Sequence, residues 1–209
     1  MSKVVNDLIR KGYLKSERII DAFSEISRIE FVPEELELQF EANFALPIGF
    51  GRMIHQPQLM AVMLELLDPR ENQRILNVGS ASGWTAALLA FIVGNKGKVV
   101  SLEKIQDLME IGRKNTDKFG YVKDGRAEFF AVDEEAGYSA LAPYDRILVL
   151  SEKEMVPKEL KKQLKLGGKM VVPVMNSLWF LEKKGEDDFL KEEYPGFSLA
   201  SFINKTSLK

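Results

Sequence analysis

The sequence predicts an α/β fold with a Rossmann-like, doubly wound and mostly parallel sheet. Three segments near the middle of the chain carry this prediction: a short apolar run (75–78), an apolar run of helical length (84–93) and a second short apolar run (98–102). Short apolar runs bounded by polar residues or glycine are typical of buried strands. A strand, a helix and a second strand in this order form a βαβ unit with two parallel strands.

The turn after the first strand and the acid after the second strand indicate a nucleotide site. The turn consists of small residues only, Gly79-Ser80-Ala81-Ser82-Gly83, and the second strand ends at Glu103. Small residues let backbone N–H groups approach a ligand, and a carboxylate at this spacing can accept hydrogen bonds from both hydroxyls of a ribose. Because the turn is not Gly-x-Gly-x-x-Gly, a single nucleoside is favoured over a dinucleotide. The alternative is an ordinary tight turn with a solvated Glu103.

The composition narrows the class of protein. The chain has 209 residues, enough for one α/β domain with a full core. Its net charge of −2 argues against non-specific binding to nucleic acid or to an anionic membrane. The lack of cysteine excludes disulfides, thiolate zinc sites and a cysteine nucleophile. No apolar run approaches the roughly 20 residues of a membrane helix, and the first residues are charged and amphipathic, so we expect a cytoplasmic protein.

We expect one domain, in which residues 1–57 form a helical cap and active-site loop and residues 58–209 form the Rossmann-like core and the C-terminal strands. Two segments separated by Gly12 have apolar residues at helical spacing, and Ser16 is the expected N-cap of the second. A third short helix is expected from Pro33 to about Phe40. The inward-facing positions of the first two helices are Val4, Val5, Leu8, Ile9, Ile19, Ile20, Phe23 and Ile26.

Residues 45–57 are expected to form an irregular loop beside the site. They contain two prolines and two glycines, and loops punctuated in this way often line binding sites. The loop carries His55, the only histidine of the chain. A single histidine is more often structural or exposed than functional. His55 is nevertheless a candidate catalytic residue, because the helix that follows leads directly into the first strand of the βαβ unit.

The rest of the chain alternates between helices and strands, as a parallel sheet requires. Helices are expected at 58–67, 105–119 and 157–166, and further parallel strands at 127–132, 146–150 and 169–173. The apolar positions of the helix at 105–119 are Ile105, Leu108, Met109 and Ile111. The segments 178–182, 188–191 and 198–203 alternate or are β-rich, and we expect antiparallel edge strands there.

Several short motifs resemble, in order, those of the protein-L-isoaspartate O-methyltransferase family, within the class I S-adenosylmethionine-dependent methyltransferases. The match extends from about residue 20 to residue 175, and the combination of motifs is more specific than the small-residue turn alone. The motifs are Phe31-Val-Pro33, Leu46-Pro-Ile-Gly-Phe-Gly51, Ile54, Gln56-Pro57, Ala142-Pro-Tyr-Asp145, Gln163-Leu-Lys-Leu-Gly-Gly168 and Val172-Pro173.

The resemblance implies a repair enzyme. Such an enzyme transfers a methyl group from S-adenosylmethionine to the α-carboxylate of L-isoaspartyl residues in damaged proteins or peptides, which are then the partners. A carboxylate is already ionised at neutral pH, so positioning matters more than acid–base help. The implied cofactor contacts are Asn77, Val78, Gly79, Ser80, Gly83, Glu103, Lys104, Asp133 and Glu134, and no metal is expected.

The chain departs from the family pattern at five site positions. Asn77 stands where the family has an acid, Ala81 and Glu134 stand where it has glycine, and Met53 and His55 replace two hydroxyl residues. His55 could instead donate a hydrogen bond to the substrate carboxylate. Ala81 would cost on the order of 1–2 kcal/mol in a left-handed conformation. After the fourth parallel strand, the charged loop Ser151-Glu152-Lys153-Glu154 replaces a small apolar loop and would change the substrate entrance. Two alternatives therefore stay open: a weak or inactive binding protein of this fold, and a methyltransferase with another substrate, whose pocket His55 and this loop would reshape. The oligomeric state is not predicted.

Overall fold

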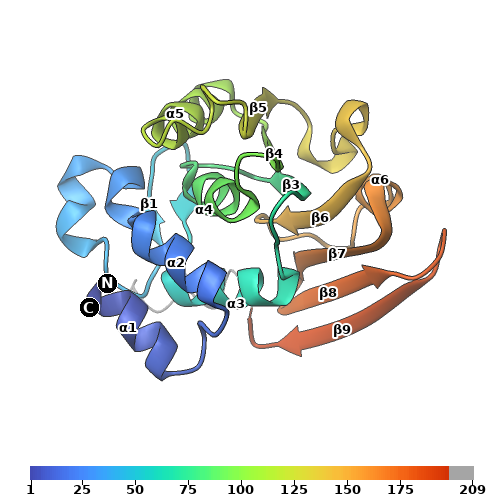
Figure 1. Cartoon of the computed structure of the whole chain (residues 1–209), viewed down its shortest axis with the longest axis horizontal. Helices are drawn as coiled ribbons and strands as arrows, with labels where there is room; N and C mark the ends of the chain where they lie inside the picture. The colour runs from blue at the N-terminus through green and yellow to red at the C-terminus, as the bar shows by residue number, and fades with distance from the viewer. Residues whose placement is uncertain (198–209) are drawn as a thin grey trace.

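A seven-stranded sheet forms the centre of the computed structural model, which describes residues 1–197 (Figure 1). The strand order is β5-β4-β3-β6-β7-β8-β9, in which the first five are parallel and the last two are antiparallel. The predicted sheet, with its antiparallel C-terminal hairpin, is confirmed. The predicted strand at 198–203 lies outside the described residues. The strands are β3 (Arg74–Val78), β4 (Lys98–Glu103), β5 (Ala127–Ala131), β6 (Tyr144–Val149), β7 (Leu164–Val174), β8 (Ser177–Lys183) and β9 (Phe189–Pro195).

Helices cover both faces of the sheet, because the chain winds outward from its centre in two directions. The crossovers from β3 to β4 to β5 run one way and that from β6 to β7 runs the other way, so the strand order reverses between β3 and β6. The first five helices lie on one face and α6 lies on the other (Figure 1). They are α1 (Lys3–Arg10), α2 (Glu17–Glu25), α3 (Pro57–Leu67), α4 (Trp84–Val93), α5 (Gln106–Asp117) and α6 (Lys158–Gln163).

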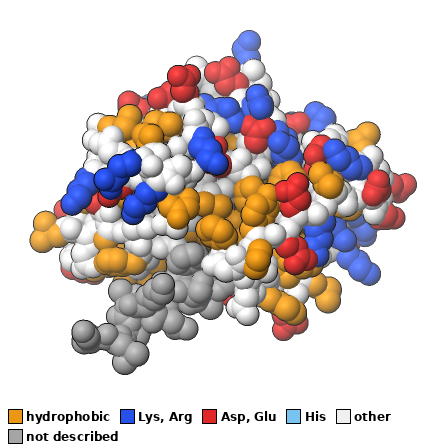
Figure 2. Space-filling model, turned by 90° about the horizontal axis from the view of Figure 1, so that it is seen from below, with side chains coloured by type: hydrophobic (Ala, Val, Ile, Leu, Met, Phe, Trp, Pro, Cys, Tyr) orange, Lys and Arg blue, Asp and Glu red, His pale blue; other side chains and the backbone are white. Residues whose placement is uncertain are grey.

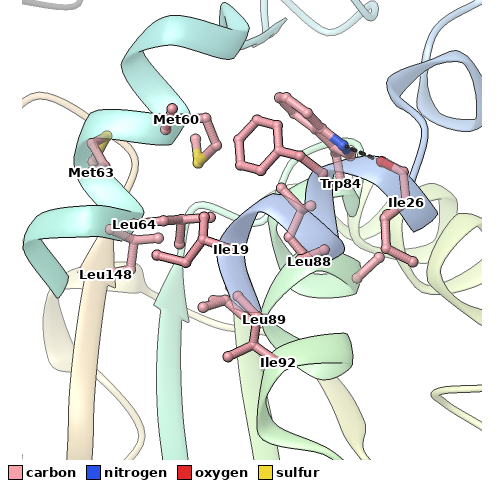
Figure 3. Packing of buried hydrophobic residues seen from close by; sticks show 14 of the residues in the cluster. Ile19, Ile26, Met60, Met63, Leu64, Trp84, Leu88, Leu89, Ile92 and Leu148 are labelled. Atoms are coloured by element: carbon pink, nitrogen blue, oxygen red, sulfur yellow. Dashed lines mark hydrogen bonds between the residues drawn. The ribbon is translucent and has the colours of Figure 1, made fainter. Parts of the chain in front are cut away.

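The core lies in two layers that alternate along the strands. On β3, Ile75 points into the layer under the cap helices and Leu76 into the layer under α6. Helix α4 is buried on almost all sides because it lies between the sheet and the cap. Figure 3 shows how Trp84 joins these parts: its indole N–H donates to the carbonyl oxygen of Ile26 at 3.2 Å. The N-terminal cap is therefore packed onto the βαβ unit as part of one core.

The N-terminal cap differs from the prediction in its loop and in one helix cap. The loop at 45–57 contains a short antiparallel hairpin of β1 (Leu46–Pro47) and β2 (Met53–Ile54). Ser16 begins α2 without capping it, because its hydroxyl instead donates to Glu65 on α3 at 2.7 Å. The helix expected after Pro33 is the 3-10 helix η2 (Glu34–Gln39), which follows η1 (Arg28–Phe31).

The second half of the chain shows two smaller differences. The last helix ends at Gln163 rather than near residue 166, because β7 begins at Leu164, which pairs with Tyr144 before a shift in register. Ile111, one of the apolar positions of the helix expected at 105–119, is 40% exposed. The 3-10 helices η3 (Glu134–Ala136) and η4 (Ser139–Leu141) follow β5.

The face in Figure 2 carries acidic and basic side chains interspersed around an apolar area, in keeping with the net charge of −2. Within residues 1–197, no helix has the length and apolar character needed to cross a membrane.

Candidate functional site

A cavity of about 340 Å³ opens at the carboxyl ends of β3, β4 and β6. This is the point at which the strand order reverses, where open α/β sheets bind their ligands. The β1–β2 hairpin and the start of α3 form one wall, and the loops after β5 and β6 form the other. The lining residues are Ala45, Gly51, Arg52, Met53, His55, Gln56, Leu59, Gly79, Ala81, Glu103, Glu134, Leu150, Ser151 and Glu152.

The small-residue turn shapes the cavity but offers few free donors. Gly79 and Ala81 line the cavity and both have positive φ, +84° and +46°, so the expected left-handed alanine is confirmed. The N–H groups of Gly79 and Ser80 both donate to the carbonyl oxygen of Leu102 at 2.9 Å. The prediction that the turn's amides face a ligand is therefore wrong for these two residues. They fix the turn to β4, and the small side chains leave room.

Gly83 has a packing role between α4 and α5. Its φ is +89°, and a Cβ built there would lie 2.3 Å from the carbonyl oxygen of Gly112 and 2.8 Å from the hydroxyl of Thr116. Gly83 does not line the cavity. Its place in the turn follows from the close approach of the two helices, which the sequence pattern could not distinguish from a ligand contact.

Glu103 is buried in the cavity wall with its orientation already fixed. The side chain is 1% exposed, which rules out the solvated alternative. One carboxylate oxygen accepts from the N–H of Ala81 at 3.2 Å, and the other accepts from the N–H groups of Lys104 at 3.0 Å and Ile105 at 3.2 Å. The guanidinium of Arg52 lies 3.9 Å from Oε1. Several donors thus hold this acid ready to accept hydrogen bonds from a ligand.

Glu134, and not Asp133, is the acid that the loop after β5 presents to the cavity. Asp133 is exposed and caps η3 by accepting from the N–H of Glu135 at 3.1 Å. Glu134 is 5% exposed, and its Oε2 accepts from the Ser151 hydroxyl at 3.2 Å. Burial first, and the nearby Glu103 carboxylate second, raise the pKa of Glu134 above its ordinary value.

His55 lines the cavity as a neutral imidazole. Burial lowers its pKa to about 4, so the ring carries one N–H at neutral pH. A carbonyl oxygen can only accept, so the contact of 2.9 Å between Nε2 and the Leu150 carbonyl places that N–H on Nε2. Nδ1 is then an acceptor. The arrangement leaves neutral His55 without an N–H for a substrate carboxylate, contrary to the role expected from the sequence.

The acid stability of the protein should depend on His55. A folded pKa of about 4 lies below the ordinary value of 6.5, so folding disfavours the protonated ring, and stability is lost as pH falls through this window. From pH 6.5 to pH 5, we expect the unfolding free energy of wild type to fall by about 1.6 kcal/mol more than that of His55→Gln. Urea unfolding at the two pH values measures this. Parallel pH profiles would contradict the burial of a neutral histidine.

Four other predicted contacts do not line the cavity. Asn77 is fully buried within the sheet, where its Nδ2 donates to the Ser101 hydroxyl at 3.3 Å and its Oδ1 has no partner among the described residues. Val78 packs in the core layer under α6, Ser80 is buried in the turn, and Lys104 is exposed. These residues can position the site, but a direct ligand contact has no geometric support.

The sequence analysis did not assign Arg52, Gln56 or Ser151 as a site residue, although it placed the loop at 151–154 at the substrate entrance. Gln56 is 4% exposed, lines the cavity and has no partner for Nε2 among the described residues. A buried, unpaired amide donor in a cavity wall suggests a ligand acceptor. The only available signal was their position: Arg52 and Gln56 lie in the glycine- and proline-rich loop, and Ser151 follows the fourth parallel strand.

Arg28, buried beneath the hairpin, holds this loop in place. Its guanidinium donates to the carbonyl oxygens of Ala42 at 3.0 Å, Phe44 at 2.9 Å and Ile54 at 3.2 Å. Burial lowers its pKa to about 9, so it stays charged at neutral pH. One planar donor thus ties the backbone at 42–44 to that of β2 behind the cavity.

The doubly wound sheet, the cavity at the strand reversal and the buried acid ending β4 place the protein among the Rossmann-like folds that bind nucleoside ligands. Residues 1–195 match the family model described as protein-L-isoaspartate(D-aspartate) O-methyltransferase. The chain belongs to that family, and the resemblance seen in the sequence is confirmed.

Relatives and solved structures agree with this assignment. The chain is 39% identical over 207 residues to the protein-L-isoaspartate O-methyltransferase of Methanopyrus kandleri, covering 97% of this chain and 91% of that protein. It is 42% identical to that of Methanothrix thermoacetophila, covering 76% and 74% of the two chains. A solved protein-L-isoaspartate O-methyltransferase superposes with a TM-score of 0.83 at 28% identity, covering 92% of this chain and 62% of that one.

A fourth comparison supports the fold alone. A Plasmodium falciparum protein described as a protein-L-isoaspartate O-methyltransferase, solved in complex with S-adenosyl-L-homocysteine, has a TM-score of 0.83 at 19% identity. The superposition covers 92% of this chain and 93% of that one.

Proposed function

We propose that the protein transfers a methyl group from S-adenosylmethionine to the α-carboxylate of L-isoaspartyl residues in proteins or peptides. The observation that carries this proposal is the buried, pre-oriented Glu103 in a cavity at the strand reversal, in a chain of the isoaspartate methyltransferase family. The product is a methyl ester, whose spontaneous conversion to a succinimide allows the residue to return to aspartyl. The protein would thus act in protein repair.

The residues that line the cavity fit this cofactor. The volume of about 340 Å³ suits a ligand of nucleoside size or larger. Glu103 can accept hydrogen bonds from both ribose hydroxyls, while Gly79 and Ala81 leave space beside it. Gln56 Nε2 and Glu134 Oε1 have no partner within residues 1–197, and a bound ligand would supply one. When bound, the cofactor supplies an electrophilic methyl group on a sulfonium.

Two side chains are available to hold the substrate carboxylate. Among the described lining residues Arg52 is the one cation, and Gln56 offers its Nε2, which has no partner there. The N–H of His55 and the hydroxyl of Ser151 are already donated within the protein. We therefore assign carboxylate binding to Arg52 and Gln56 in place of His55. The carboxylate is ionised at pH 7, so the protein has to orient it and exclude water rather than remove a proton.

Replacing Arg52 by methionine should raise the KM for an isoaspartyl peptide at least tenfold. That corresponds to about 1.4 kcal/mol, near the lower bound for a charge-assisted hydrogen bond. The dissociation constant of the cofactor should change less, because Glu103 keeps its three backbone donors. Initial rates at saturating cofactor measure the effect, and Arg52→Lys, which keeps the charge, should recover part of it. An unchanged KM in Arg52→Met would remove Arg52 from the substrate site.

Calorimetric titration with S-adenosylmethionine tests the cofactor half of the proposal. We expect micromolar binding with one site per chain. No binding up to millimolar ligand would favour the alternative of an inactive protein that kept the fold. Binding without turnover of isoaspartyl peptides would favour a different methyl acceptor.

The remaining expectations from the sequence stay predictions. A protein or peptide is the proposed partner, while nucleic acid and membranes are not expected partners because of the net charge of −2. The cytoplasmic location and the single domain spanning residues 1–209 are likewise proposed from the sequence.

A further inference from the structure

Two exposed residues mark the mouth of the cavity, one in each wall. Of the lining residues that the structure describes, Gly51 and Glu152 are exposed to solvent, and the others are partly or fully buried. Gly51 lies in the turn of the β1–β2 hairpin, and Glu152 lies in the loop after β6. Anything larger than the cavity must therefore leave it between the hairpin and Glu152.

A polypeptide acceptor has to pass through this mouth. A cavity of about 340 Å³ has the size of a small-molecule site, so the acceptor can insert little more than the residue that reacts. In an isoaspartyl residue the chain continues through the β-carboxyl group, which leaves the α-carboxylate as a short branch. The branch can enter the cavity while the neighbouring residues of the acceptor stay outside, beside Glu152.

The loop after β6 brings negative charge to the mouth that no cation of the loop offsets. Glu152 and Glu154 are both exposed, and neither forms an ion pair within residues 1–197. Lys153, between them, is paired with Glu135 at 3.4 Å, and its side chain is only 10% exposed. The next cation along the chain, Lys158, begins α6 and lines a separate groove.

The other charged residues of the cavity act on its interior rather than on its mouth. Glu103 and Glu134 are 1% and 5% exposed, so they face whatever the cavity encloses. Arg52 lies 3.9 Å from the Glu103 carboxylate, which compensates part of its charge, and it is assigned above to the acceptor's own carboxylate. Glu152 is thus the charge of the cavity wall that a residue outside the cavity meets.

We propose that Glu152 selects among acceptors and favours isoaspartyl residues whose neighbours in the chain are lysine or arginine over those with acidic neighbours. This inference rests on the proposed function and narrows its substrate class. A neighbouring lysine or arginine lies against the Glu152 carboxylate, whereas a neighbouring carboxylate is repelled by it. The neighbouring residue takes no part in the bond between the carboxylate oxygen and the methyl carbon. Its charge therefore changes the binding of the acceptor and leaves the rate of the bound complex unaltered.

Initial rates of the full chain with three isoaspartyl peptides test the proposal at saturating cofactor and low salt. The peptides differ only in the residues on both sides of the isoaspartyl residue, which are lysine, glutamine or glutamate. For wild type we expect the KM of the lysine peptide to be at least about fivefold below that of the glutamate peptide, since exposed ion pairs have effects of this size. The kcat values should agree within about twofold. In 1 M salt, where the Debye length is about 3 Å, the difference in KM should largely disappear.

Two substitutions of Glu152 and one control assign the preference to this side chain. Glu152→Gln should reduce the preference, and Glu152→Lys should reverse it in favour of the glutamate peptide, which a purely structural role would not produce. Glu71→Lys is the matched control, because it makes the same change in net charge at an exposed residue before β3, at the opposite edge of the sheet. The control should keep the wild-type preference.

The outcomes separate this inference from the proposed function. Methylation of the three peptides with equal KM by wild type, or an unchanged preference in Glu152→Lys, would overturn the inference and leave the proposed function standing. The same reversal in Glu71→Lys would also overturn it, since overall charge would then explain the preference. No methylation of any of the three peptides by protein that binds the cofactor would overturn the proposed function, and the inference with it.

Discussion

Replacing Gly83 by alanine is expected to lower the free energy of unfolding by about 4 kcal/mol. Two effects add: a left-handed φ of +89°, and a Cβ that would lie 2.3 Å from the backbone oxygen of Gly112. The Gly112 oxygen belongs to the backbone of α5, so it cannot move aside without separating α4 from α5. Urea unfolding followed by circular dichroism measures the loss.

Gly94, at the other end of α4, is a matched control for Gly83. It also has a positive φ, +66°, but a Cβ there would meet no atom within 4 Å. Gly94→Ala should therefore lose only the conformational part, about 1–3 kcal/mol, because its ψ of −173° lies in a region that residues with a side chain rarely adopt. Equal losses at the two positions would contradict the close packing of Gly83 on Gly112.

Replacing Glu103 by alanine is expected to weaken cofactor binding at least tenfold. The carboxylate would accept two ribose hydrogen bonds, and a hydrogen bond to a charged group contributes roughly 1.5–3 kcal/mol. The substitution also removes the acceptor of three backbone N–H groups, one in the turn at Ala81 and two after β4 at Lys104 and Ile105, so we expect the local shape of the site to change as well. Titration calorimetry at constant pH and salt measures the affinity.

Glu128 provides the comparison for Glu103. It lies on the adjacent strand β5, pairs with Lys98 at 2.5 Å and does not line the cavity. Glu128→Ala should leave cofactor affinity within about twofold of wild type, because exposed ion pairs contribute little and this one is remote from the ligand. Unchanged affinity in Glu103→Ala would mean that Glu103 is not the ribose partner.

The sheet and its central helix could be predicted because their signals are local. The helix 84–93 and its end at Gly94 agree with the structure, since an apolar run bounded by glycines leaves little choice. The hairpin at 46–54 could not be predicted, because strands of two residues have no periodicity. Ser16 precedes α2 as predicted, but its hydroxyl does not cap the helix because it donates to Glu65, which is distant in the sequence.

The site was predictable to the extent that it depends on strand ends. Glu103 was found because an acid at the end of β4 must lie beside the turn after β3. Hydrogen-bond partners were not predictable: the amides of Gly79 and Ser80 and the N–H of His55 are all taken by backbone carbonyls. Arg52 reaches the cavity only because the β1–β2 hairpin folds over the cavity and forms one of its walls.

The most direct test of the account measures methyl transfer from labelled S-adenosylmethionine to two peptides that differ only in one residue, L-isoaspartyl in one and L-aspartyl in the other. The account predicts base-labile incorporation into the isoaspartyl peptide and at least a hundredfold less into its isomer. Equal labelling of both peptides, or none of either by protein that binds the cofactor, would contradict the proposed activity.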